Sequence, residues 1–308
     1  MWLARYSIFC YLVCLSVIAQ ASIVPLGSYL RRTVSKFSTI LAFGDSYTAN
    51  GSLKEFYANN ETDFDEEDLH PDTIKTIKRS TNGLMWVEYL SKLINDAALY
   101  DFAQSGATAN NNLVAHPNSI DMTHQISHCL ASSAAMVPQN TSLYVLWTGV
   151  NDVRLLFEEE SDASVRKNIV DDIVASIGND VQRLYAEGAK YIMLVGLIPL
   201  DLIPMYYDKP SDTKQALNVL VEYYNAALIE ALNQFKANNP KAYASFFDTY
   251  QLFNTLFSQK ELQRNARFDC GGKSNCGDMI WWNDLHLTTS THAKIAEAMY
   301  SSIALLGW

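Results

Sequence analysis

Five short apolar runs, separated by longer segments, constrain the fold of this chain more than any other feature. Apolar runs of this length that end at turn residues are typical of strands buried on both faces. The runs cover 39–43, 98–102, 142–147, 191–197 and 242–247. Apolar residues recur at helical spacing over 84–94, 165–185, 213–235 and 290–306. This alternation predicts an α/β protein in which a mostly parallel five-stranded sheet lies between two layers of helices, a three-layer α/β/α fold.

The first residues have the pattern of a secretory signal peptide. Arg5 precedes an apolar stretch over 6–19, and small residues stand around Ala21. The stretch is shorter than the roughly 20 residues that span a bilayer, and no other stretch qualifies, so we expect no stable membrane insertion. We predict a signal peptide over 1–21 and a single secreted domain over 22–308. The polar, acidic segment 47–82 lacks periodicity and is interpreted as an insertion near the functional site.

The charge of the chain argues against one class of partner. The formal net charge is −10, and an acidic surface repels the phosphate backbone, so nucleic acid is excluded as a partner. Glycosylation sequons begin at Asn50, Asn60 and Asn140. We expect glycans at Asn60 and Asn140, whereas the position of Asn50 close to Ser46 disfavours a glycan there.

The cysteines of the predicted secreted domain fit an oxidising compartment. Cys270 and Cys276 are close in sequence across a glycine-containing loop, which favours a disulfide between them. Cys129 is then a buried free thiol. A zinc site is the competing interpretation for three cysteines, but the expected Cys-x-x-Cys pairs or histidine spacing are absent, so no metal is predicted.

The first apolar run ends at Gly44-Asp45-Ser46. A residue just beyond the carboxyl end of a buried strand stands where open α/β sheets place their ligands. Ser46 is therefore a candidate nucleophile. Because a serine hydroxyl is weakly nucleophilic without a positioned base, the chain must also supply one. It does so at His286, directly before the last helical segment.

Two further turns are expected at the same edge of the sheet. Gly106 follows the second apolar run, and Asn151 follows the third. A backbone N–H at Gly106 and the side-chain amide of Asn151 can donate to the oxyanion that forms when serine attacks an ester. Each residue alone has a simpler explanation, because glycine commonly serves backbone geometry in such a turn and an Asn-Asp pair commonly caps a helix.

In this order the four residues resemble the invariant Ser, Gly, Asn and His of the GDSL, or SGNH, hydrolases. The flanking residues most similar to fungal acetylesterases and plant-type GDSL lipases are 43–48, 82–87 and 105–108. The resemblance implies a flavodoxin-like fold and ester hydrolysis through an acyl-enzyme, with no metal or other cofactor. It also implies an oxyanion hole made by the N–H groups of Ser46 and Gly106 and the side chain of Asn151. The Gly-x-Ser-x-Gly motif of α/β-hydrolases is absent around Ser46.

The chain departs from the family pattern at the residue that orients the histidine. The family has an aspartate three residues before it, where this chain has Asn283, and Asp284 stands two residues before it. Asp284 could reach His286 after a local shift, Asn283 could accept the imidazole hydrogen bond, or a backbone carbonyl could do so. We favour Asp284, because a carboxylate stabilises the imidazolium better than an amide. This predicts that Asp284→Ala abolishes most esterase activity and Asn283→Ala leaves most of it.

These residues predict a secreted serine esterase that acts on small acyl esters, with acetylated plant-wall saccharides as the substrate. A lipase or phospholipase of the same family is the alternative within enzymes. A secreted binding protein that keeps the fold without the activity is the alternative outside them, because the acid position is altered. Trp282 is either a wall of the substrate pocket or part of the core.

Overall fold

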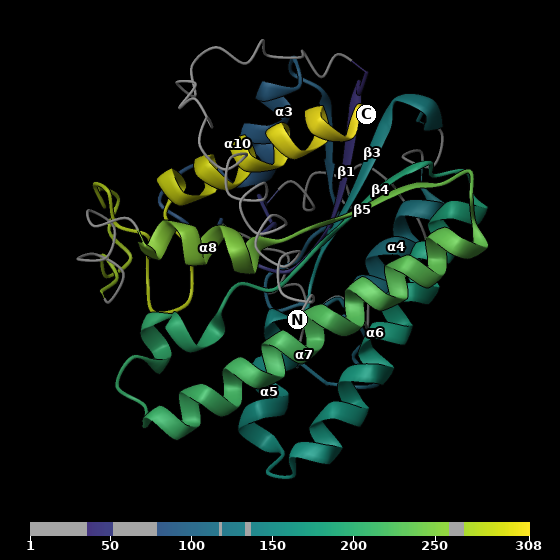
Figure 1. Ribbon diagram of the computed structural model, residues 1–308. Coiled ribbons are helices and arrows are strands. Elements are labelled where there is room, and N and C mark those ends of the chain that lie inside the picture. The colour runs from purple at the N-terminus through teal and green to yellow at the C-terminus, as the bar shows by residue number, and fades with distance from the viewer. Residues whose placement is uncertain (1–35, 52–78, 117–118, 133–136, 259–267) are drawn as a thin grey trace, which may run out of the picture. The chain divides into compact units, whose positions relative to one another are not determined.

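A parallel sheet of five strands forms the centre of the molecule in the computed structural model (Figure 1). The strands are β1 (Thr39–Gly44), β2 (Ala98–Asp101), β3 (Ser142–Trp147), β4 (Tyr191–Val195) and β5 (Tyr243–Phe247). Their order in the sheet is β2-β1-β3-β4-β5, and every neighbouring pair is parallel. This is the strand order of flavodoxin-like doubly wound sheets.

The structure describes only part of the chain. The described residues are 36–51, 79–116, 119–132, 137–258 and 268–308. The signal peptide predicted over 1–21, most of the insertion predicted over 47–82, and the sequon at Asn60 lie outside these residues.

Helices cover both faces of the sheet, which confirms the predicted three-layer α/β/α fold (Figure 1). On one face lie α3 (Trp86–Leu93), α8 (Thr249–Ser258) and α10 (Thr289–Leu306). On the other lie α4 (Met122–Ala131), α5 (Val150–Glu159), α6 (Ala163–Ala186) and α7 (Ser211–Asn238). Short 3-10 turns, η2 (Gln139–Thr141), η3 (Leu200–Leu202) and η4 (Pro204–Tyr206), complete the regular elements.

The central strands are buried because helices lie on both of their faces. All residues of β1 and β3 are buried, which is why these strands are continuous apolar runs without alternation. The register pairs Gly44 with Trp147 at the carboxyl ends of the two strands. The turns that follow β1 and β3 therefore begin side by side.

Three helices were not predicted from the pattern of apolar residues. On α4 the buried positions include the polar residues Gln125 and His128, so the apolar face is interrupted. On α5 the buried positions include Asn151 and Asp152. The third, α8, is short. Two of the three therefore place polar side chains where a helix ordinarily shows apolar ones, and Gln125, Asn151 and Asp152 belong to the site described next.

Candidate active site

The turn that carries Ser46 begins where β1 ends. The backbone carbonyl of Asp45 accepts hydrogen bonds from the N–H groups of Thr48, at 3.0 Å, and Ala49, at 2.9 Å. The Asp45 carboxylate accepts from the Tyr47 N–H at 2.9 Å. The side chain of Asp45 thus fixes the turn from inside, and Ser46 stands at its tip with 8% of its surface exposed.

Gly44 and Gln125 hold the end of β1 in place. Gly44 has a φ of +143°, and a Cβ there would lie 1.9 Å from the Trp147 carbonyl oxygen, so no other residue fits. The buried Gln125 amide accepts from the Gly44 N–H and donates to the Gly44 carbonyl, each at 2.9 Å. A side chain from α4 therefore satisfies the backbone groups that no strand reaches. Gln125 was not identified from the sequence, since a lone amide in a polar stretch carries no signal.

His286 bridges Ser46 and Asn283. Its Nε2 lies 2.9 Å from the Ser46 Oγ, and its Nδ1 lies 3.1 Å from the Asn283 Oδ1. The same Oδ1 accepts from the backbone N–H groups of His286, at 2.6 Å, and Leu285, at 3.0 Å. Because a backbone N–H can only donate, this atom must be the amide oxygen, and the His286 Nδ1 must carry a proton. The Nε2 lone pair is then free to accept the serine proton.

Asp284 does not lie at the imidazole, contrary to our preference from the sequence. It is exposed, and its backbone carbonyl accepts from the Met205 N–H at 2.9 Å. The chain from Asn283 to His286 is a tight turn closed by the Asn283 side chain, so residues three apart share a side. The family register is therefore kept, and no local shift occurs.

Several contacts hold the loop that carries His286. The Tyr47 hydroxyl donates to the Leu285 carbonyl at 2.7 Å, which ties the turn of Ser46 to this loop. The Trp282 N–H donates to the His286 carbonyl at 2.7 Å, and the Trp282 indole N–H donates to the Lys273 carbonyl at 3.0 Å. Tyr47 was not singled out from the sequence, although its position directly after the nucleophile was a usable signal.

The predicted disulfide braces the same loop. Cys270 and Cys276 are bonded, with their Cα atoms 5.4 Å apart, and Cys129 is a buried free thiol. The Gly272 N–H donates to the Trp282 carbonyl at 2.8 Å. Trp282 is thus half-buried beside the disulfide loop, and its role as a pocket wall stays a prediction.

The predicted oxyanion donors lie on turns that are bonded to each other. The Asn151 amide donates to the Ala107 carbonyl at 2.9 Å, and the described residues show no acceptor for the second N–H of its NH₂ group. Gly106 has a φ of +84°. The Gln104 N–H donates to the Gly44 carbonyl at 3.0 Å, which brings this turn beside the turn of Ser46. Ser46, Gly106 and Asn151 therefore stand at one edge of the sheet.

Burial sets the ionisation of the groups around the site. It lowers the pKa of His286 to about 4, with a further contribution from the positive charge of Arg154. The imidazole is therefore neutral at physiological pH, as a general base must be. Burial raises the pKa of both Asp45 and Asp152 to about 7. The Asp152 carboxylate accepts from the Ala109 N–H at 3.0 Å and so orders the turn beside Asn151.

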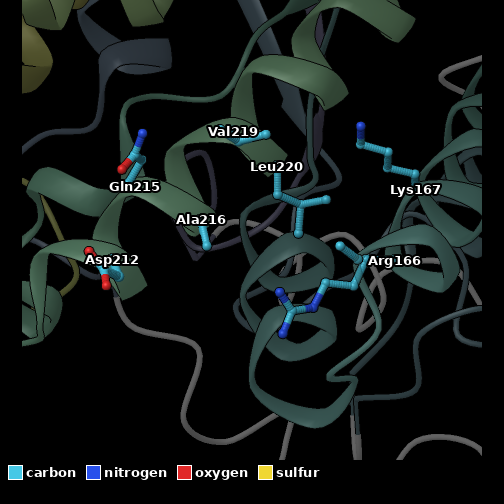
Figure 2. Close-up of a pocket in the computed structure, with 8 residues that line it drawn as sticks. Arg166, Lys167, Asp212, Gln215, Ala216, Val219 and Leu220 are labelled. Atoms are coloured by element: carbon cyan, nitrogen blue, oxygen red, sulfur yellow. The ribbon is translucent and has the colours of Figure 1, made fainter.

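A pocket of about 300 Å³ lies away from these residues, between α6 and α7 (Figure 2). It is lined by Ala163, Arg166, Lys167, Asp212, Gln215, Ala216, Val219 and Leu220. Arg166 donates to the carbonyls of Glu160 and Phe157, at 2.5 and 3.1 Å, so its guanidinium supports the turn before α6. None of the predicted site residues lines this pocket.

Neither a metal site nor a membrane span is found in the described part of the chain. No group of three or more His, Cys, Asp or Glu side chains there is arranged to hold a metal ion. No described helix is long and apolar enough to cross a membrane. Among the sequons, Asn140 is exposed and its side-chain oxygen accepts from Lys190 at 2.5 Å, whereas Asn50 is half-buried.

A parallel α/β sheet with a serine, a histidine and amide donors at its carboxyl edge has the arrangement of serine-dependent acyl hydrolases. The model of the GDSL-like lipase/acylhydrolase family matches residues 40–299. The chain belongs to this family, and it is a carboxylic ester hydrolase.

The similar proteins include esterases from fungi and plants. An acetylesterase of Thermothelomyces thermophilus is 26% identical over 84% of this chain and 86% of its own length. GDSL esterase/lipase 22 of Arabidopsis thaliana is 26% identical over 44% of this chain and 36% of its own length. Among solved structures, the acetyl xylan esterase AlAXEase is 14% identical with a TM-score of 0.46, over 86% of this chain and 98% of that one.

Proposed function

We propose that this chain is a secreted serine esterase that removes acetyl and other small acyl groups, with acetylated plant-wall saccharides as its substrates. The observation that carries the proposal is the hydrogen-bonded row Ser46, His286 and Asn283. The similarity to an acetylesterase over most of both chains supports the choice of a small acyl group.

In the first half of the proposed reaction, His286 Nε2 takes the Ser46 proton as Oγ attacks the ester carbonyl carbon. The negative charge that develops on the carbonyl oxygen is stabilised by the N–H groups of Ser46 and Gly106 and by the free N–H of Asn151. His286 then gives its proton to the alkoxide as the ester bond breaks. The alcohol leaves, and the acyl group remains on Ser46.

In the second half, His286 takes a proton from water, and the resulting hydroxide attacks the acyl carbon. The tetrahedral intermediate collapses, the proton returns to Ser46, and the carboxylic acid leaves. Asn283 keeps the imidazole in the productive tautomer throughout. It contributes no negative charge, so the imidazolium is less stabilised than beside an aspartate.

Two experiments test the proposal. A fluorophosphonate probe should label folded wild-type protein at Ser46 and leave Ser46→Ala unlabelled, and an unlabelled Ser46 in folded protein would refute the role of the nucleophile. A secreted binding protein that keeps the fold without the activity would leave Ser46 unlabelled in the folded wild-type protein. In a panel of p-nitrophenyl acetate, butyrate and palmitate with an acetylated xylo-oligosaccharide, we expect acetate and the oligosaccharide to be cleaved fastest. A preference for palmitate would replace the proposal by that of a lipase.

Secretion and glycosylation belong to the same proposal. We expect the mature protein in culture medium to begin at Ser22, with 22–308 forming one domain, and to carry glycans at Asn60 and Asn140. N-terminal sequencing and the change in mass after glycan removal measure both. A protein retained in the cell with an intact N-terminus would contradict the predicted signal peptide.

A further inference from the structure

Arg154 lies one helical turn beyond the proposed oxyanion residue Asn151 on α5. Residues three apart on a helix share a face, so the two side chains project on the same side of α5. Only 16% of the Arg154 side chain is exposed. A guanidinium is costly to bury, because it is always charged and carries five N–H donors.

Few of the N–H donors of this guanidinium have a hydrogen-bond acceptor among the described residues. One terminal nitrogen of Arg154 lies 3.1 Å from a carboxylate oxygen of Glu158. The Nε is buried without a hydrogen-bond partner among the described residues. Glu158 is shared, because its other oxygen accepts from the Tyr206 hydroxyl at 2.8 Å, and 42% of its side chain is exposed. A buried donor left without an acceptor is unfavourable, and an anionic ligand would satisfy it.

The Arg154 side chain is also close to the loop of His286. Tyr206 belongs to η4, and its neighbour Met205 donates its N–H to the Asp284 carbonyl at 2.9 Å. Burial is the main cause of the lowered pKa of His286, and the positive charge of Arg154 lowers that pKa further. These hydrogen bonds link the Arg154 guanidinium, through Glu158 and η4, to the loop that carries His286.

We propose that Arg154 is a specificity-determining residue that binds a carboxylate on the ester substrate, so that esters of acidic alcohols are preferred over neutral ones. The inference rests on the proposed esterase function and names its substrate class. A carboxylate matches the planar fork of a guanidinium, which can donate two parallel hydrogen bonds. The chain has a net charge of −10 and repels anions at long range. A preference for an anionic ester must therefore come from a local cation.

The test compares two esters that differ only in charge, 4-acetoxybenzoate and methyl 4-acetoxybenzoate, together with the corresponding 3-acetoxy pair. For each enzyme the measured quantity is the ratio of kcat/KM for the carboxylate to kcat/KM for its methyl ester. We expect Arg154→Met to lower this ratio by about tenfold or more, and Arg154→Lys to lower it less, because a charged hydrogen bond contributes about that factor. Added salt screens the attraction to Arg154 as well as the long-range repulsion, so the wild-type ratio should fall relative to that of Arg154→Met.

Arg183→Met is the matched control, because Arg183 pairs with Asp180 on α6 and its loss removes the same charge. Its ratio should equal that of the wild type. An unchanged ratio in Arg154→Met would overturn the inference while the proposed function stands, provided that Ser46→Ala abolishes turnover of both esters. Failure of wild-type protein to cleave any of the four esters would overturn both. A larger preference for 4-acetoxyphenyl phosphate than for 4-acetoxybenzoate would overturn the assignment to a carboxylate.

Discussion

Asn283 determines which nitrogen of His286 faces the nucleophile. Its amide oxygen collects two backbone N–H groups and the imidazole Nδ1–H, so it also closes the loop of the histidine. An aspartate would accept the same hydrogen bonds and add a negative charge beside the imidazole. Asn283→Asp therefore adds a negative charge at this position while it keeps the shape and the hydrogen bonds of the side chain.

For Asn283→Asp we expect an increase in kcat of at least tenfold, within the roughly 10⁴-fold that the reverse change costs a serine protease. The carboxylate favours the imidazolium and raises the pKa of His286 from about 4. Because only the neutral imidazole acts as a base, the acid limb of the pH profile should move to higher pH. The dependence of kcat/KM for p-nitrophenyl acetate on pH measures both effects, and an unmoved acid limb would contradict them.

Asn283→Ala and Asp284→Ala should rank in the reverse of the order expected from the sequence, with the larger loss of activity in Asn283→Ala. Asn283→Ala removes the acceptor that orients His286, and we expect it to lower kcat by about 10²-fold, since small displacements of catalytic groups cost that much. Asp284→Ala is the matched control and should retain activity within about twofold, because its side chain is exposed. Greater loss from Asp284→Ala would restore Asp284 as the orienting group.

Gly44 marks the position where the backbone admits no side chain. Gly44→Ala should prevent folding to an active protein, because the new Cβ would overlap the Trp147 carbonyl and φ would stay strained. The yield of soluble protein and its circular dichroism measure this. Wild-type activity in Gly44→Ala would show that the strand end adjusts.

At the scale of elements, the Gln125 side chain of α4 makes the hydrogen bonds to Gly44 that a neighbouring strand would otherwise make. Gln125→Leu removes the acceptor of the Gly44 N–H and one of the two donors to the Gly44 carbonyl, which keeps the hydrogen bond from the Gln104 N–H. We expect a loss of roughly 1–3 kcal/mol in the free energy of unfolding, and a lower kcat with little change in KM. Gln182→Leu on exposed α6 surface is the control for the loss of an amide, and equal effects of the two variants would contradict the role of Gln125.

A substitution at Gly178 on α6 should raise the free energy of unfolding, whereas Gln125→Leu should lower it. Nothing lies within 4 Å of a Cβ placed there, and alanine favours a helix over glycine. Gly178→Ala should therefore raise the free energy of unfolding by about 0.5–1 kcal/mol. Urea unfolding measures this difference, and a decrease would indicate that α6 needs the glycine for packing.

The elements that could be predicted from the sequence are those in which apolar residues recur regularly, without polar residues at many of the buried positions. The run of β3 over 142–147 was predicted to the residue, and α10 within one residue at its start, because most of the residues that pack in both elements are apolar. On α4 and α5 polar side chains occupy buried positions for the sake of the neighbouring turns, so hydrophobic spacing alone misses them. The choice between Asn283 and Asp284 depended on whether the chain there is turned or extended, which spacing does not decide.

At the scale of the whole molecule, three buried carboxyl groups predict how stability depends on pH. Burial raises the pKa of Asp45 and Asp152 to about 7 and of Asp101 to about 8, from 3.8 in the unfolded chain. From about pH 6.5 upward the three histidines of lowered pKa are neutral in the folded chain and at most half protonated in the unfolded chain, so they bind fewer protons there than the three carboxyl groups bind in the folded chain. The folded chain then binds more protons than the unfolded chain, so stability falls as pH rises through 7 to 8.

Thermal unfolding should therefore give a lower Tm at about pH 9 than at about pH 6.5. Asp45→Asn removes one of the three ionisations and should make this decrease smaller. Asp278→Asn, which changes an exposed aspartate, should leave the decrease as it is in the wild type. A Tm that rises over this interval would contradict the burial of the three groups as ionisable acids.

The bond between Ser46 and His286 joins residues 240 positions apart. The nucleophile is among the first parts of the described chain to be synthesised, and its base is among the last. A nascent chain on the ribosome therefore has a serine without a partner until the loop before α10 has emerged and packed. With Ser46 and His286 in their proposed roles, esterase activity can appear only after this loop has been synthesised and packed.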